Sequence, residues 1–141
     1  MEGVYTIASK SDYMELKVLD HAFNDGTFTA TAVYLALCTT IPTDASLGTN
    51  IVEATYTGYA RLLINASDMS AASAGSKTNS AALTFAACTA GTSTIVGFAI
   101  VDSGTTGAGN IHYWGTTTSK VIDTSNTPPT VAIGGLVVTE D

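Results

Sequence analysis

One stretch near the start of the chain shows the spacing of an amphipathic helix. Asp12 and Glu15 are spaced as in a capping box, and the Asn-Asp-Gly sequence at 24–26 favours the left-handed conformation that ends helices. Between them, apolar side chains recur every three or four residues, which places them on one helical face. The pattern predicts one helix over about residues 12–24. The apolar stripe consists of Tyr13, Leu16, Leu19 and Phe23.

After residue 26 the helical spacing gives way to short apolar runs bounded by Gly, Pro, Asn, Asp or Ser, which is typical of β-strands. Short strands separated by turns favour a β-sandwich or a barrel. We therefore expect a mainly β fold with one N-terminal helix. The predicted strands span residues 32–38, 59–65, 81–87, 94–101, 110–115, 119–123 and 130–139.

Two segments suggest where the chain meets other protein layers. Residues 95–101 are apolar throughout, so we expect both faces of that strand to be covered. The second layer could be the helix, a long loop or a neighbouring subunit. Residues 66–79 are small and polar, and a loop of this length in a compact domain is usually functional or mobile.

Composition narrows the classes of function. The 141 residues fit one domain, and only 12% are charged while 45% are hydrophobic. Such scarcity of charge suggests that other protein covers part of the surface. A net charge of −7 with five basic residues argues against binding to nucleic acid or to an anionic membrane. No membrane-spanning run or signal peptide is apparent, so we expect a chain made in a cytoplasm.

The sequence shows no arrangement of residues that indicates catalysis. Neither His21 nor His112 belongs to a sequence pattern that combines a nucleophile, a base and an orienting group, and no GxSxG motif occurs. Cys38 and Cys88 lie in apolar runs, where free cysteines are usually buried. The loop at 102–110 is the best candidate for a calcium site, but its single carboxylate makes a glycine-rich turn the better interpretation. We expect no catalytic residue, no metal and no cofactor.

A few side chains are candidates for structural or interaction roles. Arg61 interrupts an apolar run, which predicts a carboxylate partner, either Asp44 or Glu53. We favour an ion pair that anchors a loop over a contact with another subunit. Asp44 would then either pair with Arg61 or cap the loop that follows it. Tyr113 and Trp114 could form a stacking platform for a sugar or a base, although core and rim positions are commoner for such a pair.

Seven motifs between residues 12 and 141 occur in an order that is similar to a family of small structural proteins of tailed bacteriophages. Some members are labelled tail-fibre proteins, and others that look like them are capsid cement proteins. The resemblance implies a non-enzymatic virion component with an antiparallel, jelly-roll-like β-sandwich, and we expect this domain over residues 11–141. Residues 1–10 extend ahead of the family pattern, and we expect them to form an N-terminal arm. The motifs are DYMELKVLDHAF, VYLALCTTIPTDA, GYAR, NSAALTF, VGFAIVD, GNIHYWGTTTSKVI and VVTED.

Within that family the sequence favours a capsid cement (decoration) protein. It shows neither the coiled-coil heptads nor the repeats expected of a fibre. We expect a homotrimer, with a dimer as the alternative, that bridges subunits of the major capsid protein on the outside of the virion. The alternative function is a tail-fibre or tail adaptor protein that binds a receptor or glycan through Tyr113, Trp114 and the 102–110 loop.

Overall fold

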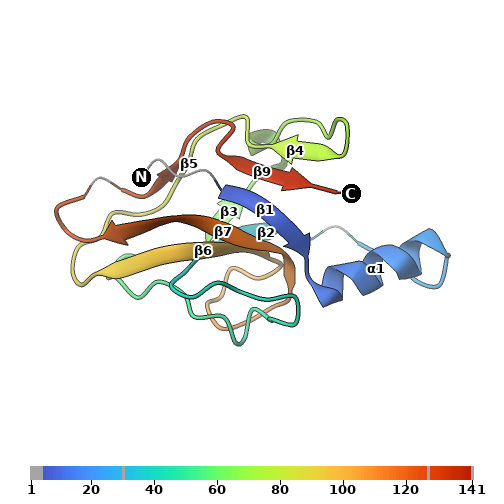
Figure 1. Cartoon of the computed structure of the whole chain (residues 1–141), viewed down its shortest axis with the longest axis horizontal. Helices are drawn as coiled ribbons and strands as arrows, with labels where there is room; N and C mark the ends of the chain where they lie inside the picture. Colours follow the sequence, from blue (N-terminus) through green and yellow to red (C-terminus); the bar gives the residue numbers. More distant parts are fainter. Residues whose placement is uncertain (1–4, 30, 127, 141) are drawn as a thin grey trace.

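A strongly curved β-sheet dominates the computed structural model, which describes residues 5–29, 31–126 and 128–140 (Figure 1). Its seven strands follow the order β3-β2-β6-β7-β1-β9-β4, and a second sheet consists of β5 and β8. The elements are β1 Tyr5–Lys10, α1 Asp12–Ala22, β2 Val33–Cys38, β3 Leu62–Ile64, the 3-10 turn η1 Ala66–Asp68, β4 Ser76–Thr78, β5 Leu83–Thr84, β6 Ser93–Val101, β7 Ile111–Ile122, β8 Thr130–Val131 and β9 Leu136–Thr139.

The expected mainly β fold, with its antiparallel sheet and one helix near the N-terminus, is confirmed. Strands β3, β2, β6, β7 and β1 pair antiparallel, and β6 with β7 forms the long central pair. The sheet then continues through a parallel pairing of β1 with β9 and an antiparallel pairing of β9 with β4. The small β5–β8 sheet packs over the same core and provides a partial second layer.

Several boundaries differ from the prediction. The segments predicted at 110–115 and 119–123 are one strand, β7, because the Thr residues between them are β-branched and continue the extended backbone. The segment predicted at 130–139 is divided by a turn in which Gly134 has a φ of 74°. Within the long loop at 66–79, the first three residues form η1 and residues 76–78 form β4.

Residues 5–10 belong to the segment that the sequence predicts as an N-terminal arm. They form β1, which pairs with β7 on one side and β9 on the other. Both edges of β1 are therefore hydrogen-bonded within the sheet of this copy. Residues 1–4 of the expected arm lie outside the described residues.

Strand β6 has buried side chains on both faces, as its apolar run predicts. Phe98 and Ile100 belong to the large core cluster between the two sheets, whereas Ala99 and Val101 belong to a smaller cluster on the opposite face. The residues that complete the smaller cluster include Ile51, which belongs to the segment between β2 and β3. The second layer over β6 is therefore a loop of the chain itself rather than the helix.

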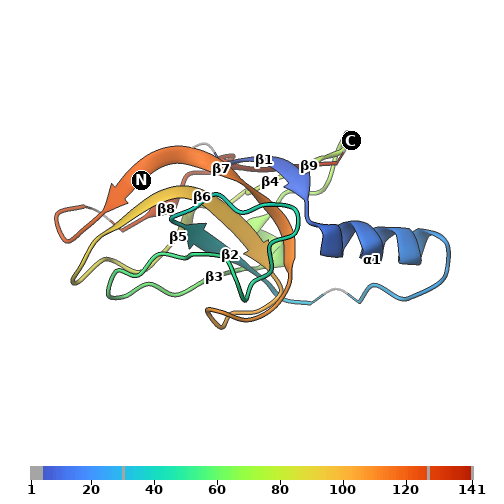
Figure 2. The ribbon, with the colours of Figure 1, turned by 60° about the horizontal axis from the view of Figure 1, so that its bottom comes forward.

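Helix α1 projects from one end of the sheet (Figures 1 and 2). Its N-cap is Ser11, whose hydroxyl accepts a hydrogen bond from the Met14 amide, so the predicted cap at Asp12 is one residue late. Met14 is the buried side chain of the helix, while most of the predicted apolar stripe is exposed to solvent. In the part of the chain that the structure describes, no helix is long and apolar enough to cross a membrane.

Candidate functional site

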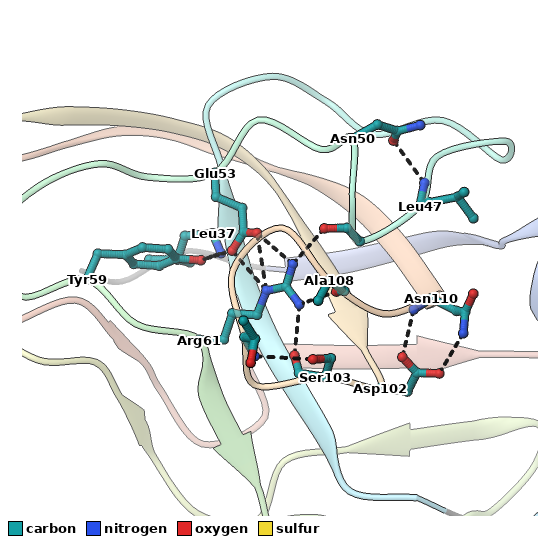
Figure 3. A network of polar contacts seen from close by, with 12 residues as sticks. Leu37, Leu47, Asn50, Glu53, Tyr59, Arg61, Asp102, Ser103, Ala108 and Asn110 are labelled. Carbon is teal, nitrogen blue, oxygen red and sulfur yellow. Dashed lines mark hydrogen bonds and ion pairs between the residues drawn. The ribbon is translucent and has the colours of Figure 1, made fainter.

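The most concentrated group of buried polar contacts is centred on an ion pair between Arg61 and Glu53 (Figure 3). Both residues are only 6% exposed. The Arg61 Nη2 lies 2.7 Å from Glu53 Oε1, and Nε lies 3.2 Å and 3.1 Å from the two carboxylate oxygens. This two-point contact is the geometry that a guanidinium forms best with a carboxylate. Of the two partners considered from the sequence, the structure pairs Arg61 with Glu53.

The remaining donors of Arg61 hold two loops. Nη1 donates to the carbonyl oxygens of Ser103 at 2.8 Å and Ala108 at 2.7 Å, and Nη2 donates to the carbonyl of Gly48 at 2.9 Å. An arginine has five N–H donors, and these contacts together with Glu53 use all of them. Arg61 therefore acts as a brace that ties the loop at 48–53 to the loop at 102–110.

Glu53 is satisfied from its other side by Tyr59. The Tyr59 hydroxyl donates to Glu53 Oε2 at 2.6 Å and accepts a hydrogen bond from the Leu37 amide at 3.1 Å. Burial, with the Glu53 carboxylate second, raises the pKa of Tyr59 far above its usual value, so the phenol keeps its proton. Burial likewise raises the pKa of the neighbouring Cys38 thiol to about 12, with Glu53 adding to the effect. Cys38 is accordingly a neutral, buried thiol.

The loop at 102–110 is a closed turn. The Asp102 carboxylate accepts hydrogen bonds from the Asn110 amide at 2.6 Å and the Asn110 side chain at 3.0 Å, which fastens the two ends of the loop. A Cβ atom at Gly48 would lie 2.3 Å from the Ala108 carbonyl oxygen, so the two braced loops meet at a position that only glycine can occupy. Among residues 5–29, 31–126 and 128–140, no three His, Cys, Asp or Glu side chains are grouped as metal ligands.

Asp44, the other candidate partner, contacts Trp114 instead of Arg61. Its carboxylate accepts a hydrogen bond from the Trp114 indole at 3.0 Å, and its carbonyl accepts one from the Asp12 amide at 3.0 Å. Asp44 thus joins the segment after β2 to β7 and to the first turn of α1. Sequence distance concealed this contact, because Trp114 is 70 residues away.

Tyr113 and Trp114 do not form a shared platform. They are consecutive residues of β7, and side chains alternate between the faces of a strand. Tyr113 packs against the large core cluster, and its hydroxyl donates to Glu140, whereas Trp114 packs against the smaller cluster on the other face. A sugar or base stacked on both rings at once is therefore incompatible with the strand geometry.

His112 is buried where β7 meets helix α1 and the 102–110 loop. Its ring stacks on Tyr13 with centroids 6.0 Å apart and meets the edge of Phe28 at 5.8 Å. Burial lowers the pKa of His112, and the Asp102 carboxylate, 4.0 Å away, opposes that shift. His21, in contrast, lies on the exposed surface of α1.

Sequence reasoning missed most of the groups that complete the brace. Gly48, Ser103 and Ala108 contribute backbone carbonyls, which carry no signal in their residue type. Tyr59 did carry a signal, because it lies two residues before Arg61 in an apolar segment and its hydroxyl needed a partner. Taken together, the contacts form a cluster in which the Tyr59 hydroxyl and every N–H donor of Arg61 are engaged by protein groups.

Comparisons with known proteins identify the family of this chain. No curated protein matches this chain. A family model described as podophage GP4 fiber I protein gp80 matches residues 9–139, which is nearly the whole chain. The resemblance to virion structural proteins is supported at this level, although the matching description is that of a fiber protein and not of a cement protein. The chain therefore belongs to the Gp80 family, the family of podophage GP4 fiber I protein gp80.

Proposed function

We propose that this chain is a non-enzymatic structural subunit of a phage virion and that it belongs to a fibre assembly. The observation that carries the structural role is the saturated Arg61–Glu53 cluster. Its buried charges hold loops 48–53 and 102–110 in place, with every Arg61 donor engaged by protein. A substrate could reach these groups only by displacing bonds that maintain the fold. The family description favours a fibre location over the head.

A capsid cement protein remains the second candidate, because one feature of the chain favours it. The braced loops lie beside exposed apolar side chains at Ile41, Leu47 and Val52, which are 50%, 41% and 52% exposed. A rigid loop surface with apolar side chains suits docking onto an assembled lattice, where binding raises shell stability by mass action. The partner would be the major capsid protein of the head, and the cement protein would act as a homotrimer or a dimer.

The two candidates predict different defects in a phage that lacks this protein. A fibre subunit is expected to be present in few copies per virion, and its loss should reduce adsorption to host cells while heads keep their resistance to heat. A cement protein is expected in hundreds of copies, and its loss should release DNA at a lower temperature while adsorption stays normal. Quantitative mass spectrometry of purified virions gives the copy number, and both assays use the same virions.

Complementation supplies the control. A plasmid copy of the wild-type gene should restore whichever property was lost, and a copy with the exposed change Thr118→Ser should restore it equally. Virions that lack the protein yet adsorb normally and keep full head stability would contradict both structural roles.

A further inference from the structure

Helix α1 presents an apolar face that the described residues of this copy leave uncovered. Leu16, Leu19 and Phe23 are 62%, 55% and 80% exposed, and their spacing puts them on one side of the helix. Met14, which is buried against the body, lies on the opposite side. An apolar helical face of this kind is unusual for a surface helix, whose apolar side normally faces the core.

The base of α1 is fixed, so the helix is not free to cover its own stripe. The Ser11 amide donates to the His112 carbonyl at 3.1 Å, and the Asp12 amide donates to the Asp44 carbonyl at 3.0 Å. The Ser11 hydroxyl also donates to the Ile111 carbonyl. Rotating the stripe onto the body would break these bonds, which lie in a buried environment.

The body carries a groove with the complementary chemistry. It has a volume of about 330 Å³, and its lining is mainly apolar, with contributions from Val33, Ile64, Met69 and Val138. Tyr113 also lines it and pairs in the sheet with Lys10, two residues before α1 begins. The groove therefore lies at the end of the body from which the helix projects.

Charge at the two surfaces is complementary as well. Lys77 lines the groove and donates to the Ser70 carbonyl, but it has no ion-pair partner among the described residues. On the helix, Glu15 and Asp20 flank the stripe and form no ion pair there either. The groove's own carboxylate, Glu140, is already engaged by Lys10 and Tyr113.

We propose that the stripe of α1 from one copy of the chain docks into the groove of a second copy. Residues at i, i+3 and i+7 are the anchors with which an amphipathic helix fills a groove. Every copy carries both a helix and a groove at the same end, so two copies facing each other can exchange helices reciprocally. Exchange doubles the contact of one docked helix, which helps to reach the roughly 800 Å² per partner of a stable interface. Self-association of this kind is independent of whether the protein belongs to a fibre or to the head.

The test is the oligomeric state of the purified full chain, measured by sedimentation velocity over a range of protein concentrations. The wild-type chain should associate, and Phe23→Glu should raise the dissociation constant at least roughly tenfold. Ala72→Trp places a large side chain in the groove from an exposed position and should have the same effect. Val18→Glu is the matched control, because Val18 is an exposed apolar residue of α1 outside the stripe, and it should associate like the wild type.

Mixing the two defective variants separates helix-in-groove docking from other modes of association. Phe23→Glu keeps an intact groove and Ala72→Trp keeps an intact helix, so an equimolar mixture should form heterodimers although neither variant associates alone. Pairing of helix against helix would leave the mixture monomeric and would overturn the proposal. A wild-type chain that stays monomeric at every concentration, or a Phe23→Glu variant that associates as tightly as the wild type, would overturn it too.

Discussion

The loops braced by Arg61 and the projecting helix α1 differ from an ordinary protein surface in opposite directions. Around Arg61, charged groups are buried, and each one is satisfied by a partner within the chain. On α1, apolar groups are exposed, and the part of the chain that the structure describes supplies no cover for them. The Arg61 brace places polar atoms in the interior, where apolar atoms are expected. Helix α1 places apolar atoms on the surface, where polar atoms are expected.

This difference indicates which region contributes to folding stability and which contributes to association with other proteins. A buried ion pair affects folding stability most when one partner is removed, because the other partner then remains as an uncompensated charge in a dry environment. An exposed apolar side chain contributes little to the fold but gains free energy when another surface covers it. We therefore expect changes in the brace to affect folding and changes in the helix stripe to affect association.

The largest effect is expected from breaking the brace at Arg61. Arg61→Met should lower the free energy of unfolding by about 3–5 kcal/mol, because Glu53 would keep its buried charge with only the Tyr59 hydroxyl as a side-chain partner. Adding Glu53→Gln to Arg61→Met should recover part of this loss, since the buried charge is then removed. Urea unfolding followed by far-UV circular dichroism measures both.

The matched control is the exposed ion pair between Lys10 and Glu140, whose side chains are 24% and 40% exposed. Lys10→Met should cost no more than about 1 kcal/mol, because solvent screens the charges of an exposed pair. If Lys10→Met and Arg61→Met lower the free energy of unfolding equally, burial does not determine how much the Arg61 cluster contributes to stability.

A second buried polar anchor extends the comparison beyond the brace. Asn79 is 1% exposed, its side-chain amide donates to the carbonyls of Ala81 and Ala132, and its side-chain oxygen accepts from the Leu136 amide. Asn79→Leu should lower the free energy of unfolding by about 1–3 kcal/mol, because these backbone groups would stay buried without partners.

Asn126 provides the control for the Asn79 change. Its amide also bonds to a backbone carbonyl, that of Val121, but the residue is exposed and water can replace the contact. Asn126→Leu should therefore change the same free energy by less than about 0.5 kcal/mol in the urea titration. If both variants unfold at the same urea concentration, buried hydrogen bonding is not what Asn79 provides.

The brace illustrates what the sequence could and could not predict about the site. A lone Arg61 in an apolar run predicted a carboxylate partner, because such a charge is rarely buried unpaired. Choosing between Asp44 and Glu53 required the path of the loop between them, and only Glu53 forms a bridge beside Cys38 of β2. The carbonyl acceptors at 48, 103 and 108 follow from loop conformation, which residue type does not specify.

The fold shows the same division between local and long-range information. The helix and strands β2 and β6 were predictable, because their spacing or apolar length is a local property. Strands β1 and β4 were not, since Ser, Thr and Lys make up half of β1 and all of β4. Their pairing with β9 stabilises them as strands. The exposure of the helix stripe was also beyond local reasoning, because its spacing is the same whether the helix faces a core or projects from it.

His112 lies at the junction of the two regions and makes their contact sensitive to pH. Burial lowers the pKa of the folded-state imidazole below its usual value of 6.5, so the unfolded chain binds more protons than the folded one as the pH falls through 6.5. The stability that neutral His112 contributes should thus decrease as the pH falls below 6.5. His112→Phe keeps an aromatic ring beside Tyr13 and should flatten that part of the pH profile of unfolding. Parallel profiles for the two proteins would mean that His112 does not titrate differently on folding.

The smallest effect on stability is expected on the helix stripe. Leu16→Gln and Leu19→Gln should each change the free energy of unfolding by less than about 0.5 kcal/mol at a protein concentration low enough to keep copies apart, because both side chains are already exposed and Gln is a comparable helix former. Met14→Gln, on the buried side of the same helix, should lower the free energy of unfolding clearly more, since it places an amide in an apolar contact.

At higher protein concentration the wild type should gain stability that the two stripe variants lack, because association then covers the stripe. If the free energy of unfolding is independent of protein concentration in all four proteins, the stripe does not take part in a contact between copies. The Arg61 brace would then be the feature with the larger effect on the stability of this chain.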